Sequence, residues 1–174
     1  MDFTQTPIQP GEGLQNSFSQ YLTFMLDGEE YGIDILKVQG IQSYGKVTPL
    51  PQTPDYVLGV VNLRGAIVPI IDLRLRFEMK SLAITANTVV IVVKVTDIGQ
   101  ERTVGLLVDA VSEVREVPDL ERRPAPEFGS SVNSDYIDGL ATIDDRMLIL
   151  LDIDHLVNSG VMEQMESSQN ISLQ

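Results

Sequence analysis

An internal repeat constrains the fold of this chain more than any single motif does. The motif Tyr-x-x-Gly at residues 56–59 recurs at residues 136–139. The stretch Ile-Ile-Asp-Leu at residues 70–73 recurs as Leu-Leu-Asp-Ile at residues 150–153, so both pairs share an offset of 80 residues without a gap. Chance matching of β-patterns explains one such pair, but two pairs in the same order favour an internal duplication.

The repeat predicts the fold class. Each copy contains about five short apolar stretches with strand character, and the upstream spacing of residues 32–41 recurs at residues 105–114. Five short strands leave too many free edges for an isolated open sheet. Two small barrels packed together close most of those edges. We therefore predict a mainly β protein of two five-stranded lobes with short helices, including a C-terminal helix from Asp152 to about Met165.

Residues 59–72 predict the most informative hairpin. Two apolar runs flank the polar break Asn62-Leu63-Arg64-Gly65, and glycine tolerates the positive φ of a tight turn. This places Arg64 at the tip, where a fixed cation suits recognition; the alternative is a solvated turn arginine. The second copy carries Asp144-Asp145 at the same place. Recognition by an arginine therefore belongs to one lobe only.

Composition excludes several classes of function. The formal charge of −13 disfavours nucleic acid and anionic membrane surfaces. The chain has no cysteine, which excludes disulfides and thiolate metal sites. Residues 1–18 contain no Lys or Arg, and no apolar run approaches the roughly 20 residues that span a bilayer. We expect a soluble, cytoplasmic protein without membrane insertion.

The sequence offers little for catalysis. His155 is the only histidine and falls in the expected C-terminal helix, where a lone histidine is usually a surface residue. Asp144 and Asp145 suit a turn, and Asp152 and Asp154 suit a helix N-terminus. No phosphate-binding glycine loop, metal-ligand spacing or nucleophile motif occurs. We predict a binding protein without enzymatic activity, cofactor or metal.

Several residues stand out as candidates for binding. Arginine and aromatic side chains are the usual anchors of protein interfaces, which singles out Arg64 and Phe128. For Phe128 the alternative is a residue that pins its long loop to the body. For Val38, Ile41 and Val89 the alternative is ordinary core packing.

A series of ordered motifs closely resembles the CheW family of bacterial chemotaxis coupling proteins. The resemblance covers residues 18–158 and rests on residues 31–39, 53–59, 62–65, 68–74, 88–92, 123–128 and 145–150. It implies two five-stranded, SH3-like barrel lobes with a groove between them. It also implies a domain at residues 19–158 whose intertwined lobes meet near residues 87 and 88. Outside the resemblance, composition predicts a disordered tail at residues 1–18 and a helix end with a polar tail at residues 159–174.

The resemblance implies an adaptor function. Proteins of this family bridge the cytoplasmic tips of chemoreceptors (methyl-accepting chemotaxis proteins) to the histidine kinase CheA, whose regulatory domain is itself similar to CheW, and they assemble with further CheW and CheA subunits into rings. The chain would then be recruited from the cytoplasm to receptor arrays. Carried over by position, the receptor-facing residues are Val38, Asn62 and Arg64, with Ile33, Ile35 and Ile41 as an apolar floor. The kinase-facing residues are Gly59, Pro54 and Tyr56, and the ring-interface residues are Val89, Arg123 and Phe128.

The chain departs from the family pattern at one position. Relatives often carry an acidic residue two places after Val38, where this chain has Gly40. A charge contact expected in the receptor site is therefore missing. The alternatives to a receptor–CheA adaptor are a CheW-like module in a different receptor–kinase system, a β-barrel that binds oligonucleotides, and, weakest, a hydrolase.

Overall fold

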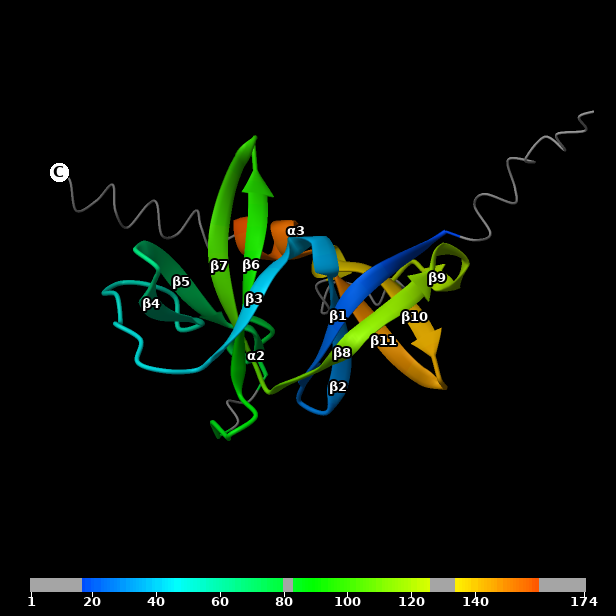
Figure 1. Cartoon of the computed structure of the whole chain (residues 1–174), viewed down its shortest axis with the longest axis horizontal. Coiled ribbons are helices and arrows are strands. Elements are labelled where there is room, and N and C mark those ends of the chain that lie inside the picture. Colours follow the sequence, from blue (N-terminus) through cyan, green and yellow to red (C-terminus); the bar gives the residue numbers. More distant parts are fainter. Residues whose placement is uncertain (1–16, 80–82, 126–133, 160–174) are drawn as a thin grey trace, which may run out of the picture.

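The structure, a computed structural model, describes residues 17–79, 83–125 and 134–159. Its elements are short strands joined mostly by tight turns (Figure 1). The strands are β1 (Phe18–Leu26), β2 (Glu29–Asp34), β3 (Val38–Ser43), β4 (Val57–Leu63), β5 (Ala66–Asp72), β6 (Val89–Asp97), β7 (Gln100–Val108), β8 (Ala110–Pro118), β9 (Arg122–Arg123), β10 (Ile137–Ile143) and β11 (Arg146–Leu151). The helices are α2 (Leu73–Arg76) and α3 (Ile153–Val157), with 3-10 turns η1 (Ile35–Lys37), η2 (Asp119–Glu121) and η3 (Ser134–Tyr136).

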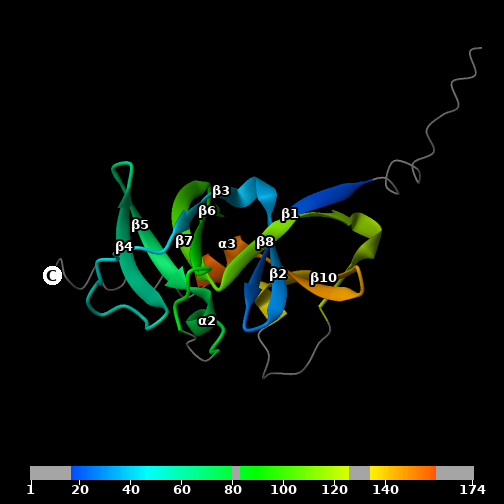
Figure 2. The same ribbon diagram turned by 60° about the horizontal axis from the view of Figure 1, so that its bottom comes forward.

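The strands form two lobes that lie side by side (Figures 1 and 2). One sheet has the order β3-β6-β7-β5-β4, and we call it the Arg64 lobe after the residue at its β4–β5 tip. The other has the order β8-β1-β2-β11-β10-β9, and we call it the Asp144 lobe after the β10–β11 tip. The predicted mainly β fold of two lobes with short helices is confirmed, and the two-residue strand β9 gives the Asp144 lobe a sixth strand among the described residues.

The two lobes repeat each other in register as well as in sequence. In β4–β5 the pairing shifts between Val57 and Gly59, and in β10–β11 it shifts at the equivalent residues, 80 positions later. Asp72 donates its backbone N–H to the carbonyl of Tyr56 at 2.8 Å, and Asp152 donates to Tyr136 at 2.8 Å. Strands β3 and β8 also carry a shift at equivalent residues. The predicted internal duplication is confirmed.

The two copies exchange strands. Strands β1 and β2 of the first copy pair with β8 and β11 of the second, and β6 and β7 of the second pair with β3 and β5 of the first. The lobe boundary expected near residues 87 and 88 therefore does not separate the two sheets. Alternating hydrophobicity specifies a strand and its buried face, but it does not specify which distant strand becomes the partner.

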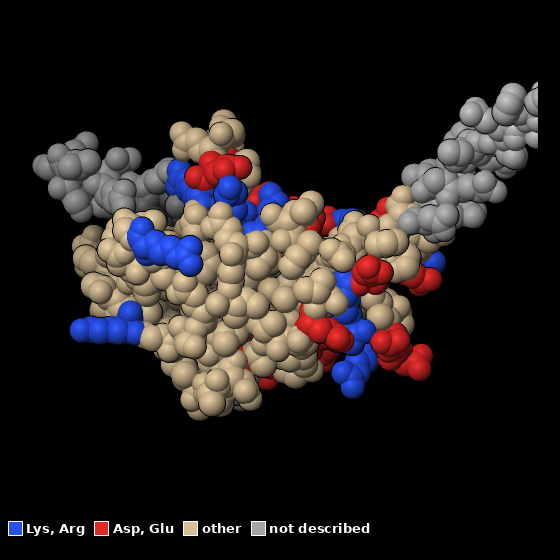
Figure 3. Space-filling model, viewed as in Figure 1, with Lys and Arg blue, Asp and Glu red and all other residues tan. Residues whose placement is uncertain are grey.

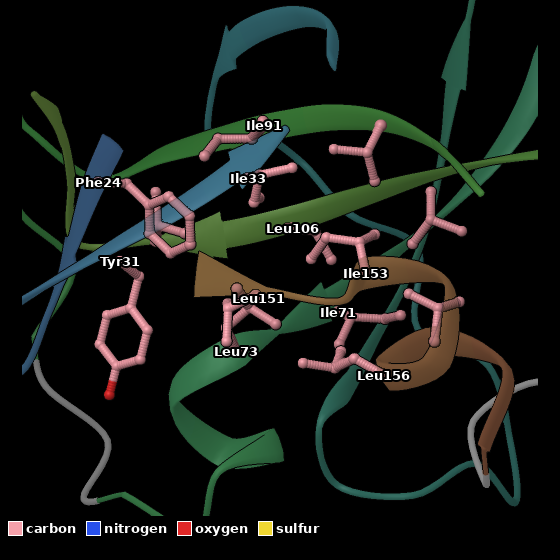
Figure 4. Packing of buried hydrophobic residues seen from close by; sticks show 14 of the residues in the cluster. Phe24, Tyr31, Ile33, Ile71, Leu73, Ile91, Leu106, Leu151, Ile153 and Leu156 are labelled. Atoms are coloured by element: carbon pink, nitrogen blue, oxygen red, sulfur yellow. The ribbon is translucent and has the colours of Figure 1, made fainter. Parts of the chain in front are cut away.

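Exchange of strands gives the lobes a shared core. The largest buried cluster draws residues from both sheets and both helices, including Phe24, Ile33, Ile71, Leu106 and Leu156 (Figure 4). Strand β6 contributes to two clusters: Ile91, Val93 and Val95 face the shared core, whereas Val90 and Val92 face the interior of the Arg64 lobe. Burial on both faces explains the uninterrupted apolar run of this strand.

The ends of the described chain agree with the sequence in part. Helix α3 begins after Asp152, whose side chain accepts a hydrogen bond from the His155 backbone N–H at 3.1 Å. The predicted extension to Met165 lies outside the described residues, as do residues 1–16 of the predicted N-terminal tail. Phe18, assigned to that tail, is the first residue of β1.

The turn between β6 and β7 predicts a stabilising substitution. Ile98 is 96% exposed and has a φ of 45°, a conformation that costs a β-branched residue roughly 1 to 2 kcal/mol. Gly99 follows with a φ of 76°, so Ile98→Asn would create the Asn-Gly pair that such two-residue turns prefer. We expect the free energy of unfolding in urea to rise by about 1 kcal/mol. Ile84→Asn, at an exposed residue outside any strand, is the control; an equal gain there would show that lower surface hydrophobicity, rather than turn geometry, is responsible.

Candidate functional site

The β4–β5 turn presents Arg64 at its tip, as predicted. Arg64 and Gly65 have φ values of 51° and 87°, the two positive values of a type I′ turn. The side-chain oxygen of Asn62 accepts a hydrogen bond from the Gly65 backbone N–H at 2.9 Å and so closes the turn. Asn62 thereby holds the conformation in which Arg64 projects into solvent.

Arg64 borders an open pocket of about 320 Å³. The pocket lies between β3, the β4–β5 turn and β7, and its lining includes Gly40, Gln42, Arg64 and Thr103. None of its described lining residues is acidic, and Arg64 forms no ion pair or hydrogen bond within the described part of the chain. Figure 3 shows isolated blue side chains around the β4–β5 end, whereas red and blue intermix over the Asp144 lobe. The pocket therefore carries an arginine without a counter-charge.

On the equivalent surface of the Asp144 lobe, the arginine is paired with carboxylates of the chain itself. Arg115 lies on β8, where it forms ion pairs with Asp144 at 3.0 Å, Glu113 at 2.8 Å and Glu30 at 3.4 Å. Hydrogen bonding to Asp144 raises the pKa of Arg115, so the guanidinium stays charged. The two lobes thus differ in charge at their corresponding tips.

The residues predicted for the receptor-facing floor do not all reach this pocket. Ile41 is 47% exposed and lines it. Val38 and Ile35 are partly buried and pack against the shared core. Ile33 has no exposed surface, so it supports β2 from inside and offers nothing to a partner. Alternation along a short apolar stretch does not distinguish these positions, because β2 is covered on both faces.

The residues predicted to face the kinase lie at the base of the same hairpin. The Pro54 carbonyl accepts a hydrogen bond from the Val57 N–H at 3.0 Å, which fixes the approach to β4. The ring of Tyr56 lies 5.1 Å from the Arg76 guanidinium, which also lies 4.7 Å from the ring of Tyr136. Burial raises the pKa of Tyr56, and the charge of Arg76 opposes that rise. Gly59 is buried, so its part in any interface is indirect.

Of the residues predicted for the ring interface, the two that the structure describes lie in different lobes. Val89 is partly buried at the start of β6, between Val108 and Ser43 in the Arg64 lobe. Arg123 is exposed on β9 of the Asp144 lobe. Phe128 lies outside the described residues.

Sequence reasoning missed a buried ion pair at the end of β5. Asp72 and Arg74 are each 2% exposed, and two carboxylate–guanidinium hydrogen bonds of 3.0 and 2.9 Å join them. Arg74 also contacts Asp109 at 3.2 Å. The sequence held one sign of this pair. Arg74 of the first copy corresponds to Asp154 of the second, so only the first copy places a cation two residues after the shared aspartate.

The remaining candidate for chemistry is His155, which packs against an aromatic ring. His155 is exposed on α3, with its ring tilted against Tyr136 at 5.6 Å. Among the residues that the structure describes, no group of His, Asp and Glu side chains could hold a metal ion. Within the same described residues, no helix is long and apolar enough to cross a bilayer.

The fold and this surface define a class of protein: a duplicated, two-lobed β module that presents a cationic hairpin tip beside an open pocket. The model of the CheW-like domain matches residues 20–161. The chain belongs to the CheW family.

Individual relatives agree with this assignment. The chemotaxis protein CheW of Klebsiella aerogenes is 50% identical over 143 residues, which cover 82% of this chain and 84% of the relative. The chemotaxis protein CheW of Rhizobium meliloti is 37% identical over 150 residues, covering 86% and 94%. The crystal structure of the scaffolding protein CheW from Thermoanaerobacter tengcongensis aligns with a TM-score of 0.73 and 31% identity, covering 83% of this chain and 90% of that one.

Proposed function

We propose that this chain is a non-catalytic chemotaxis scaffold that couples chemoreceptors to the histidine kinase CheA. It would act by coupling the binding of a receptor at one surface to the state of the kinase bound at another, and it would catalyse no reaction. The observation that carries the proposal is the presentation of Arg64 on a tight, hydrogen-bonded turn beside a pocket without a counter-charge. Membership of the CheW family, whose relatives are named chemotaxis proteins, supplies the biological context.

The proposed surfaces share one hairpin and the faces beside it. The receptor tip would contact Arg64 and Ile41, with Asn62 holding the turn, and Val38, Ile35 and Ile33 supporting the strands behind it. The kinase regulatory domain would dock at the hairpin base, near Pro54 and Tyr56 and above Gly59. Val89, Arg123 and Phe128 would face neighbouring CheW or CheA subunits in rings. Because the first two surfaces lie at opposite ends of β4, a receptor that reorients the tip is mechanically linked to the kinase.

Sedimentation with receptor-bearing membranes tests the proposal directly. Purified CheA is sedimented with the membranes in the presence and absence of this protein, and kinase activity is measured in the pellet. We expect both recruitment and activation to require the protein, which would draw it from the cytoplasm to the receptor arrays. A protein that binds neither membranes nor CheA would belong to a different receptor–kinase system, and this proposal would fail.

Arg64→Glu is the sharpest single variant for this function. We expect receptor-coupled kinase activity to fall at least about tenfold, because a carboxylate would replace the cation at the docking tip. The fold should be unaffected, with a change in unfolding free energy within about 0.5 kcal/mol, because Arg64 is exposed and unpaired among the described residues. Arg146→Glu, an exposed arginine in the Asp144 lobe, is the control for net charge. Full coupling in a folded Arg64→Glu protein would remove Arg64 from the site.

A further inference from the structure

The duplication allows each charge at one tip to be compared with its counterpart at the other. Strand pairing fixes the correspondence. Gly40 on β3 pairs with Val92 on β6, and its counterpart Glu113 on β8 lies beside Thr23, the counterpart of Val92, on β1. Through the same register, four charged residues of the Asp144 lobe acquire counterparts in the Arg64 lobe. Glu113, Arg115, Asp144 and Glu30 correspond to Gly40, Gln42, Arg64 and Thr103.

This comparison shows what is missing around Arg64. In the Asp144 lobe the four side chains form one cluster, with Arg115 paired to all three carboxylates. In the Arg64 lobe their four counterparts line the same open pocket, and only the arginine is charged. Where the first cluster fills its surface with ion pairs, the second leaves a pocket of about 320 Å³ with one guanidinium at its rim.

The absence of a carboxylate here is a local feature rather than a consequence of composition. The chain has 25 acidic residues and only 12 Lys and Arg, so an exposed arginine has acidic residues in excess around it. The adjoining pocket of about 200 Å³ contains Lys46 and likewise has no acidic residue in its described lining. This end of the molecule is therefore attractive to anions within a strongly acidic protein.

We propose that the Arg64 pocket takes a single Asp or Glu side chain from the receptor tip. This carboxylate would pair with Arg64 from outside, whereas in the other lobe Arg115 is paired with carboxylates of the chain itself. The inference rests on the proposed receptor coupling and identifies its chemistry. Gln42 would provide a neutral hydrogen-bond donor beside the guanidinium, and Thr103 would provide a second one on releasing the hydrogen bond of 3.3 Å that its hydroxyl donates to Gln39. Gly40 acts as a specificity determinant, because a carboxylate there would occupy Arg64 internally.

Gly40→Glu tests the inference. A Cβ added at Gly40 meets no atom within 4 Å, so the side chain fits without moving the backbone and can reach the pocket that it shares with Arg64. Affinity for receptor-bearing membranes is measured by co-sedimentation without CheA. We expect Gly40→Glu to weaken binding roughly tenfold or more, since it removes a charge-assisted hydrogen bond to the partner. Gly40→Gln, of the same shape without the charge, should bind within about twofold of the unsubstituted protein.

Two further arms separate the possible causes. Gly45→Glu adds the same charge at a site with nothing within 4 Å that lines the adjoining pocket and not this one, so a loss of binding there as large as that of Gly40→Glu would point to the charge of this end of the molecule rather than to pairing with Arg64, and would overturn the proposal. On the receptor, the acidic residues of the tip are neutralised one at a time. One of these changes should make the unsubstituted and Gly40→Glu proteins bind with equal affinity.

The outcomes distinguish this inference from the function on which it rests. If the unsubstituted protein fails to bind receptor membranes, the coupling function fails and this inference fails with it. If that protein binds but Gly40→Glu binds equally well or more tightly, coupling stands and the carboxylate pocket is overturned. If binding falls for Gly40→Glu alone and salt weakens the unsubstituted protein more than the Arg64→Gln variant, the pocket is established.

Discussion

Asp72→Ala should lower the free energy of unfolding by about 3 to 5 kcal/mol, the largest loss that we expect from a single charged residue in this chain. Its carboxylate accepts hydrogen bonds from the side chain and the backbone N–H of Arg74, and both residues are 2% exposed. In the native protein, hydrogen bonding to Asp72 raises the pKa of Arg74, so its guanidinium is charged. In Asp72→Ala this buried charge loses its principal partner. Urea unfolding followed by circular dichroism measures the loss, which corresponds to roughly 6 to 20 °C in Tm.

The duplication supplies the control for this prediction. Asp152 caps α3 as Asp72 caps α2, but Asp154 stands where the first copy has Arg74, so no buried cation depends on it. Asp152→Ala should cost only about 1 kcal/mol, the usual value of a helix cap. Replacing both partners, as Asp72→Ala with Arg74→Leu, should recover much of the loss because no charge is left buried. Equal losses at Asp72 and Asp152 would show that capping, rather than the ion pair, accounts for the effect.

Local patterns predicted the elements that local physics determines. The polar breaks at residues 62–65 and 144–145 indicated two hairpins, and the structure has a two-residue turn at each place. Asp152 indicated a helix start, and it caps the short helix α3, while the structure shows that Asp72 caps α2 at the equivalent place. The offset of 80 residues predicted the duplication without reference to any relative.

Long-range pairing could not be predicted from the same patterns. The exchange of β1 and β2 with β6 and β7 depends on which apolar faces meet in the shared core, and alternation along one strand carries no such information. The burial of Ile33 follows from this exchange, because β2 lies in the middle of a sheet and against the other lobe. The Arg115–Asp144 pair was equally invisible, since 29 residues separate its members.

The charge contrast between the tips became apparent only when sequence and structure were combined. The sequence showed that Arg64 and Asp144 occupy equivalent turns, but it assigned no partner to either residue. The structure shows that Asp144 forms an ion pair with Arg115, whereas the counterpart of Arg115 in the other lobe is the neutral Gln42. In this duplicated fold, one lobe therefore pairs its arginine internally, and the equivalent surface of the other lobe leaves a cation available for binding.

Gly59→Ala should destabilise the Arg64 lobe by about 2 to 5 kcal/mol. Gly59 has a φ of 143°, which L side chains rarely adopt, and a Cβ there would lie 2.1 Å from the Thr48 carbonyl oxygen. Thr48 and Val60 exchange two backbone hydrogen bonds of 2.9 Å across this contact. The added methyl group would separate residues 47–48 from β4 and break both bonds. Urea unfolding measures the loss, and Gly40→Ala, where a Cβ meets nothing within 4 Å, should change stability by less than about 1 kcal/mol.

This prediction also decides how Gly59 contributes to kinase binding. The resemblance to the family places Gly59 on the kinase-facing side, but a buried glycine without a side chain has little to offer a partner. If its role is to let residues 47–48 approach β4, the loss of CheA binding in Gly59→Ala should follow the fraction of unfolded protein and should be recovered in part by second-site stabilisation with Ile98→Asn. If the variant is as stable as the unsubstituted protein yet fails to bind CheA, Gly59 lies within the interface itself and the packing argument is wrong. The two readings give opposite results in one pair of measurements, because folding and binding are assayed on the same sample.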